Sequence, residues 1–99
     1  MSYKVIYTKH SQLDYDSLDG SQKRQIRKSV EKIEMNGMKV GQELHSKLID
    51  CRKLKHKKLG LRVIFKQSDA GIEIVEIVAI GKRSDDEVYD VATKRLGRI

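Results

Sequence analysis

The spacing of apolar residues changes period part-way along the chain, and this change constrains the fold more than any other feature. Ile26, Val30 and Ile33 recur at steps of four and three, which places them on one face of a helix over residues 21–36. From Ile49 onward apolar and polar residues alternate instead, as they do on half-buried strands. Helical segments followed by a run of strands predict an α+β domain.

Shorter signals complete the predicted order of elements. Residues 3–8 alternate as a strand, and residues 11–18 favour a short helix. Two alternating runs on either side of Leu59-Gly60 predict an antiparallel hairpin, and residues 72–80 form an apolar central strand. Ser84 opens a capping box of the S-x-x-E type before a final helix. The sequence therefore predicts a small, mostly antiparallel four-stranded sheet with its helices packed on one face.

A chain of 99 residues suits a single domain spanning residues 1–99. The core of such a short chain is thin, so part of its stability is expected to depend on a partner. The longest apolar run, residues 77–80, is far too short to cross a bilayer, and no signal peptide is recognisable. Cys51 is the single cysteine and is predicted to be a small buried residue rather than a nucleophile. These features predict a soluble cytoplasmic protein without membrane association.

The formal net charge of +7 predicts an anionic partner, which is a nucleic acid, a membrane surface or an acidic protein. A basic surface that is merely solvated is the alternative. Glycine-rich phosphate-binding motifs are absent from the sequence, so no nucleotide cofactor is predicted. The three histidines lie far apart in the sequence, and no metal site is predicted.

The most informative feature is the placement of cations on the predicted hairpin. Side chains alternate across a strand, so Lys53 and Lys55 point to one side. Arg62 and Lys66 face away from the apolar side of the next strand, and Arg83 follows the strand after that. Cations gathered on one face repel each other, and a polyanion relieves this repulsion. The sequence thus predicts a positive sheet face, although an uncommitted solvent face remains the alternative.

Such a face has the groups that RNA cleavage by the 2′-OH requires. Cations stabilise the charge that develops on the phosphate, which is usually the largest contribution to catalysis. A lysine among other cations favours its neutral form and can act as a base, whereas arginine stays charged and clamps phosphate oxygens. Tyr89, near the start of the final helix, is able to stack on a base. Rim packing of Tyr89 is the alternative.

Several segments of the chain resemble the RelE family of bacterial toxins. They are residues 18–22 (LDGSQ), 50–55 (DCRKLK), 60–65 (GLRVIF), 77–83 (IVAIGKR) and 87–89 (EVY). The resemblance implies a RelE-like, microbial-RNase-like α+β fold. It also implies a toxin that enters the ribosomal A site and cleaves mRNA there without a metal ion.

The resemblance further implies a role for each matching residue. Lys53 matches the general base, Lys55 a residue that stabilises the transition state, and Arg62 a phosphate contact. Arg83 matches the acid that protonates the leaving group, and Tyr89 the residue that orients the nucleotide. Neighbouring cations are predicted to bind RNA; they are Arg52, Lys57, Lys66 and Lys82.

Two alternatives remain at this point. ParE toxins share the fold but poison DNA gyrase, without nuclease activity and without the full set of basic residues. Other relatives use a histidine or glutamate as acid or base, which makes His45 and His56 alternative candidates. Both readings imply a cognate acidic, RelB-like antitoxin in a toxin–antitoxin hetero-oligomer. The antitoxin is expected to wrap the basic face or to displace the terminal helix around Tyr89.

Overall fold

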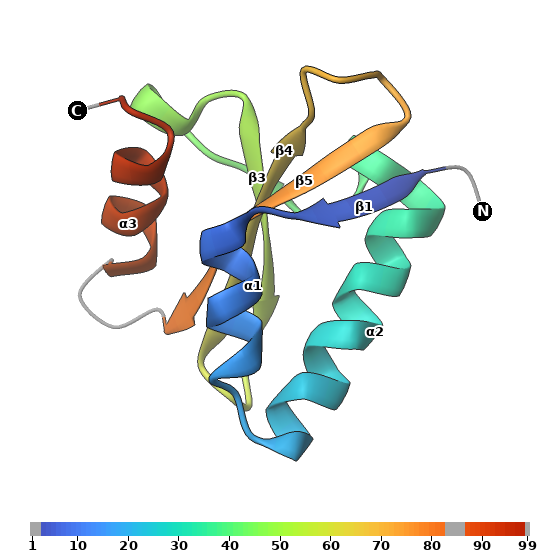
Figure 1. Ribbon diagram of the computed structural model, residues 1–99, viewed down its shortest axis with the longest axis vertical. Helices are drawn as coiled ribbons and strands as arrows, with labels where there is room; N and C mark the ends of the chain where they lie inside the picture. The colour runs from blue at the N-terminus through green and yellow to red at the C-terminus, as the bar shows by residue number, and fades with distance from the viewer. Residues whose placement is uncertain (1–2, 83–86, 99) are drawn as a thin grey trace.

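The computed structural model describes residues 3–82 and 87–98. Two helices follow the first strand, four strands come next, and a third helix ends the chain (Figure 1). The elements are β1 (Lys4–Tyr7), α1 (Lys9–Asp16), α2 (Gly20–Asn36), the 3₁₀ turn η1 (Gly37–Lys39), β2 (Gln42–Glu43), the 3₁₀ turn η2 (Ser46–Leu48), β3 (Cys51–His56), β4 (Leu61–Gln67), β5 (Ile74–Lys82) and α3 (Glu87–Arg95).

The five strands form one sheet in the order β1-β5-β4-β3-β2. Strands β2 to β5 pair antiparallel, and only β1 runs parallel to its neighbour β5. The predicted α+β class and the mostly antiparallel sheet are therefore confirmed. The sheet has five strands rather than four because β2 adds Gln42 and Glu43 at the edge. Two residues are too few to show a period, so apolar spacing could not predict this strand.

The helices cover both faces of the sheet, which corrects the prediction that they pack on one face. On one face α2 places Ile26 and Ile33 against Val63 and Phe65 of β4. On the opposite face α3 places Val88 and Ala92 against a second apolar cluster that includes Ile64 of β4. Figure 1 accordingly shows α2 and α3 on opposite sides of the strands.

Polar side chains set the starts of the first two helices. Thr8 accepts a hydrogen bond from the backbone N–H of Ser11, and Asp19 accepts one from that of Gln22. Each pair forms a reciprocal capping box, which satisfies backbone donors that a helix start leaves free. The cap at Thr8 explains why α1 begins two residues before the predicted helix. The predicted cap at Ser84 lies outside the described residues.

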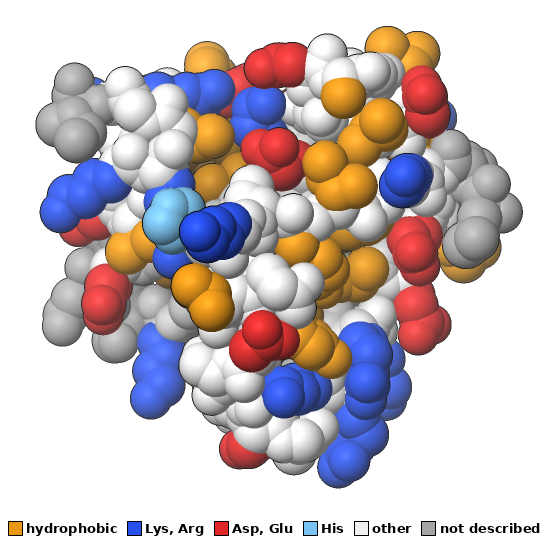
Figure 2. Space-filling view, viewed as in Figure 1, with side chains coloured by type: hydrophobic (Ala, Val, Ile, Leu, Met, Phe, Trp, Pro, Cys, Tyr) orange, Lys and Arg blue, Asp and Glu red, His pale blue; other side chains and the backbone are white. Residues whose placement is uncertain are grey.

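The exposed side of α2 is strongly basic at its N-terminal half. Lys and Arg side chains gather there in the space-filling view (Figure 2), and Arg24, Arg27 and Lys28 are all exposed. These cations occupy the solvated outer face that the helical spacing predicts. Among the described residues, no helix combines the length and the apolar character that a membrane crossing requires.

Candidate active site on the β3–β4 hairpin

The antiparallel register of β3 and β4 brings three cations together. Lys55 lies directly opposite Arg62, and Lys53 lies opposite Ile64 two residues further along the same face. Side chains paired in this way have Cβ atoms about 5 Å apart, and diagonal neighbours are about 7–8 Å apart. Lys53, Lys55 and Arg62 therefore form a compact group, which we call the cationic cluster.

Tyr89 joins the cationic cluster from α3, 36 residues away in the sequence from Lys53. Lys53 Nζ donates a hydrogen bond of 3.1 Å to the Tyr89 hydroxyl and lies 5.3 Å from the centroid of its ring. This distance is within the range of a cation–π contact. The structure thus brings together four of the five residues predicted to carry the chemistry. The fifth, Arg83, lies outside the described residues.

Arg62 occupies the centre of this arrangement. It lies opposite Lys55 of β3 on one side and opposite Gly81 of β5, which has no side chain, on the other. A Cβ atom at Gly81 would lie 3.3 Å from the Val88 side chain, and glycine therefore allows α3 to approach β5 closely. Arg62 Nε is buried without a hydrogen-bond partner among the described residues. Unsatisfied donors of this kind are rare in proteins and call for an explanation.

The loop before β2 supports the strand that carries Lys53. The Arg52 side chain donates to the carbonyl oxygens of Val40 at 2.9 Å and Gly41 at 2.8 Å. Gly41 has a φ of +85°, and a Cβ atom there would lie 2.4 Å from the Lys53 carbonyl oxygen. Only glycine permits this close approach, which fixes the backbone of β3 at Lys53.

Three of the predicted RNA-binding cations lie away from the cationic cluster. Arg52 points to the opposite face of the sheet, where it bonds the loop and lies 3.5 Å from the Glu43 carboxylate. Lys82 is also on that face, since it pairs with Leu61. Lys66 shares the face of Lys53 but is 7% exposed. Its Nζ donates to the Gln67 carbonyl oxygen at the far end of β4.

The prediction that Lys66 shares a face with Lys53, Lys55 and Arg62 is confirmed, but its ammonium group is directed toward Gln67 and Asp69 rather than toward the cationic cluster. Lys66 pairs with Cys51 at one end of the hairpin, whereas Lys55 pairs with Arg62 near the other end. Alternation fixes the face of a side chain but not its position along the strand, and four residues separate Arg62 from Lys66. Lys57, by contrast, is exposed and lines a hollow of about 430 Å³ with Lys55 and Lys58.

The two histidine candidates occupy different places. His45 lines a hollow of about 380 Å³ together with Tyr89 and Asp90, so it lies beside the tyrosine that contacts Lys53. His56 pairs with Leu61 on the opposite face, where its Nε2 forms a hydrogen bond with the hydroxyl of Ser29 in α2. The His56 ring is therefore directed toward α2 rather than toward the cationic cluster.

Burial of His56 predicts a pH-dependent stability. Burial, with a smaller contribution from Lys32, lowers the pKa of His56 from its ordinary value of 6.5. Near and below pH 6.5, His56 is therefore protonated to a greater extent in the unfolded chain than in the folded protein. We therefore expect the free energy of unfolding to fall as the pH drops from about 7.5 to 5.5. Urea unfolding of wild type and His56→Gln should show a shallower pH slope in the variant, and parallel slopes would contradict this assignment.

Cys51 is buried in the apolar cluster beneath α3, as predicted. Burial is the main cause that raises the pKa of its thiol to about 11. The thiol therefore stays protonated near neutral pH and is a poor nucleophile. Within residues 3–82 and 87–98, no three His, Cys, Asp or Glu side chains lie close enough together to hold a metal ion.

Known proteins resemble this chain over almost its whole length. No family model matches it. A putative RelE-like toxin protein from Escherichia coli is 28% identical over 96 residues, which cover 97% of this chain and 99% of that protein. The mRNA interferase toxin RelE of the same species is 23% identical with the same coverage.

Solved structures share the fold. A variant of the E. coli toxin RelE in the free state gives a TM-score of 0.79 at 23% identity, covering 97% of this chain and 99% of that chain. A variant of this toxin bound to a peptide of the antitoxin RelB gives 0.71 at 21% identity, covering 93% and 95%. The chain is similar to RelE toxins over almost its whole length and shares their fold.

These similarities confirm the resemblance to RelE toxins, and the α+β fold, that the sequence motifs indicate. These relatives and structures are RelE toxins, which does not favour a ParE-like gyrase poison. The RelE fold accounts for the order of elements and for the hairpin that carries the cationic cluster.

Proposed function

We propose that this protein is a ribosome-dependent mRNA endoribonuclease and the toxin of a toxin–antitoxin pair. The observation that carries the proposal is the meeting of Lys53, Lys55 and Arg62 on one sheet face, with Tyr89 hydrogen-bonded to Lys53. A face that concentrates cations beside an aromatic ring suits a phosphate next to a nucleobase. We take residues 1–99 as one toxin domain.

We assign the steps of the reaction to these side chains from the resemblance to RelE toxins, and the meeting of Lys53, Lys55 and Arg62 supports the assignment. The 2′-oxygen of the RNA attacks the adjacent phosphorus, and the bond to the 5′-oxygen of the next nucleotide breaks. Lys53 removes the 2′-OH proton, and Lys55 and Arg62 stabilise the negative charge of the phosphorane. Arg83 is assigned to the leaving 5′-oxygen from its sequence motif. The products are a 2′,3′-cyclic phosphate and a 5′-OH, and no metal ion takes part.

The ribosome supplies the alignment that the protein lacks. The cationic cluster and Tyr89 supply cations and a hydroxyl. Among the described residues, no carboxylate forms an ion pair with Lys53, Lys55 or Arg62. Alignment of the 2′-oxygen with the phosphorus contributes a large part of the rate in reactions of this kind. We propose that the ribosomal A site holds the mRNA in this geometry, which places the protein in the cytoplasm.

Mapping of mRNA ends in cells tests this function against the ParE-like alternative. Primer extension on mRNA from cells that express the chain is expected to show discrete cuts within translated codons. Arg83→Ala is expected to remove both the cuts and the growth inhibition. DNA breaks and an SOS response without mRNA cuts would support gyrase poisoning instead and would contradict the proposal.

An acidic antitoxin is the proposed partner. One relative is known in complex with an antitoxin peptide, and the net charge of +7 favours an acidic segment. We expect the antitoxin to cover the cationic cluster or to displace α3 with Tyr89, so that the complex is inactive. A structure of the complex in which Lys53 and Arg62 stay open and Tyr89 stays on Lys53 would contradict this expectation.

A further inference from the structure

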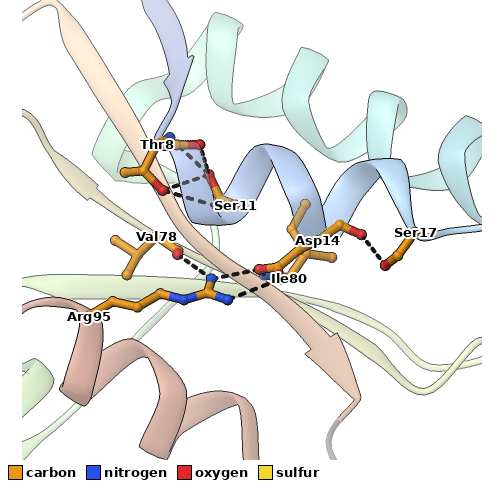
Figure 3. A network of polar contacts seen from close by, with 7 residues as sticks. All are labelled: Thr8, Ser11, Asp14, Ser17, Val78, Ile80 and Arg95. Atoms are coloured by element: carbon orange, nitrogen blue, oxygen red, sulfur yellow. Dashed lines mark hydrogen bonds and ion pairs between the residues drawn. The ribbon is translucent and has the colours of Figure 1, made fainter.

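The edge of β5 is only partly covered by another strand. Parallel pairing with β1 ends at Ile77, which lies opposite Tyr7. Beyond this point two side chains take the place of a strand. The Ile80 N–H donates to Asp14 Oδ2 at 3.0 Å, and Arg95 Nη1 donates to the Val78 carbonyl oxygen at 3.0 Å (Figure 3). Backbone groups that lack a partner strand are thus satisfied by α1 and α3.

The two side chains also bind each other. Arg95 donates two hydrogen bonds to the Asp14 carboxylate, Nη1 to Oδ2 at 2.6 Å and Nη2 to Oδ1 at 3.0 Å (Figure 3). Their side chains are only 21% and 19% exposed, so water screens the pair less than it screens a surface pair. Bidentate pairs of arginine and carboxylate also fix the direction of approach. The ion pair therefore connects α1, β5 and α3 in one geometry.

Two of the three elements that meet at this ion pair, α3 and β5, lead to the cationic cluster. Helix α3 carries Tyr89, which lies six residues before Arg95, or about 9 Å along the helix axis. Strand β5 continues from Ile80 to Gly81, which lies opposite Arg62. Val88 and Ala92 hold α3 on the sheet, but apolar contacts do not fix the rotation of a helix as directional bonds do.

We propose that Asp14 and Arg95 are positioning residues, whose ion pair holds Tyr89 over Lys53 in the orientation that receives the RNA nucleotide. The assignment rests on the proposed nuclease function. A second ion pair, Arg98 with Asp50, independently holds the segment after α3. Loss of the first pair therefore loosens α3 without releasing it from the domain.

The test compares two variants that each replace one ion-paired carboxylate by an amide and so change the net charge by the same amount. Asp14→Asn breaks the ion pair on α3, whereas Glu43→Gln breaks the pair with Arg52 on β2. Arg95→Lys is a second disruption, which keeps the charge and loses the bidentate geometry. Asp14→Glu restores the carboxylate and should restore part of the activity.

The readouts are the NMR signals of labelled tyrosine rings, hydrogen exchange of α3 amides, and mRNA cleavage on saturating ribosomes. In Asp14→Asn we expect a shifted Tyr89 signal and faster exchange in α3, with unchanged exchange in β3 and β4. The cleavage rate should fall at least about tenfold, because a misplacement of about 1 Å can cost about 100-fold. Affinity for the ribosome should stay within about twofold, since the cations of the cluster remain.

Each outcome decides the proposal. If Asp14→Asn and Glu43→Gln show the same Tyr89 signal and the same cleavage rate, the ion pair of Asp14 with Arg95 does not position the site. If Asp14→Asn fails to fold, Arg95→Lys gives the same comparison. If the wild-type protein cleaves no mRNA, the nuclease function fails, and the Tyr89 signal and α3 exchange still determine whether the pair holds the helix.

Discussion

Replacement of Lys53 by alanine is expected to slow mRNA cleavage on the ribosome by roughly 100-fold or more, the usual effect of removing a general base. Lys53 is central because it contacts Tyr89 and lies beside Lys55 on the same face of β3. The folded state loses one hydrogen bond, so the free energy of unfolding should change by only about 1 kcal/mol. Single-turnover cleavage and urea unfolding of the same samples measure the two effects.

Lys9→Ala is the matched control for this experiment. Lys9 is an exposed lysine at the start of α1, and its removal lowers the net charge by the same amount. The control should keep close to wild-type cleavage, since Lys9 belongs to a helix that packs on β5 and β1 rather than on the hairpin. Equal losses in Lys9→Ala and Lys53→Ala would mean that total charge, and not a specific site, governs cleavage.

Phe65→Ala is expected to destabilise the protein by about 3–5 kcal/mol, the range for deleting a buried phenylalanine ring. Phe65 is 0% exposed and lies in the core between the sheet and α2. The total stability of a small domain is only about 5–15 kcal/mol. The variant should therefore unfold at a much lower urea concentration and lose toxicity through loss of the folded state.

Ile72→Ala is the control for the effect of Phe65. Ile72 is 77% exposed in the turn before β5, so its truncation should change the free energy of unfolding by no more than about 0.5 kcal/mol. Urea unfolding monitored by circular dichroism compares the two variants. Similar midpoints for both would show that Phe65 is not part of the core that the structure describes.

Much of the fold could be predicted because apolar spacing is a local signal. The steps of Ile26, Val30 and Ile33 define a helix face before any tertiary contact forms, and these positions are indeed directed toward β4. Alternation on the hairpin likewise fixed which side chains share a face. The position of α3 was not predictable in the same way, because its apolar stripe of Val88 and Ala92 suits either face of a sheet.

The site shows the same division between local and distant information. Lys53 and Lys55 lie two residues apart, so the strand period alone puts them together. The ion pair of Asp14 with Arg95 spans 81 residues, and neither residue has a local signal that distinguishes it from other surface charges. Arg52 similarly reads as one more cation of the hairpin, although its partners are carbonyl oxygens of residues 40 and 41.

Analysis of the RNA ends produced by the purified protein on mRNA-programmed ribosomes tests the central claim most directly. Attack by the 2′-oxygen at a phosphate held by Lys53, Lys55 and Arg62 predicts cuts in the A-site codon, with a 2′,3′-cyclic phosphate on one fragment and a 5′-OH on the other. Lys53→Ala should give few or none of these ends. A wild-type protein that leaves the mRNA intact, or a Lys53→Ala protein that cuts equally well, would contradict the account.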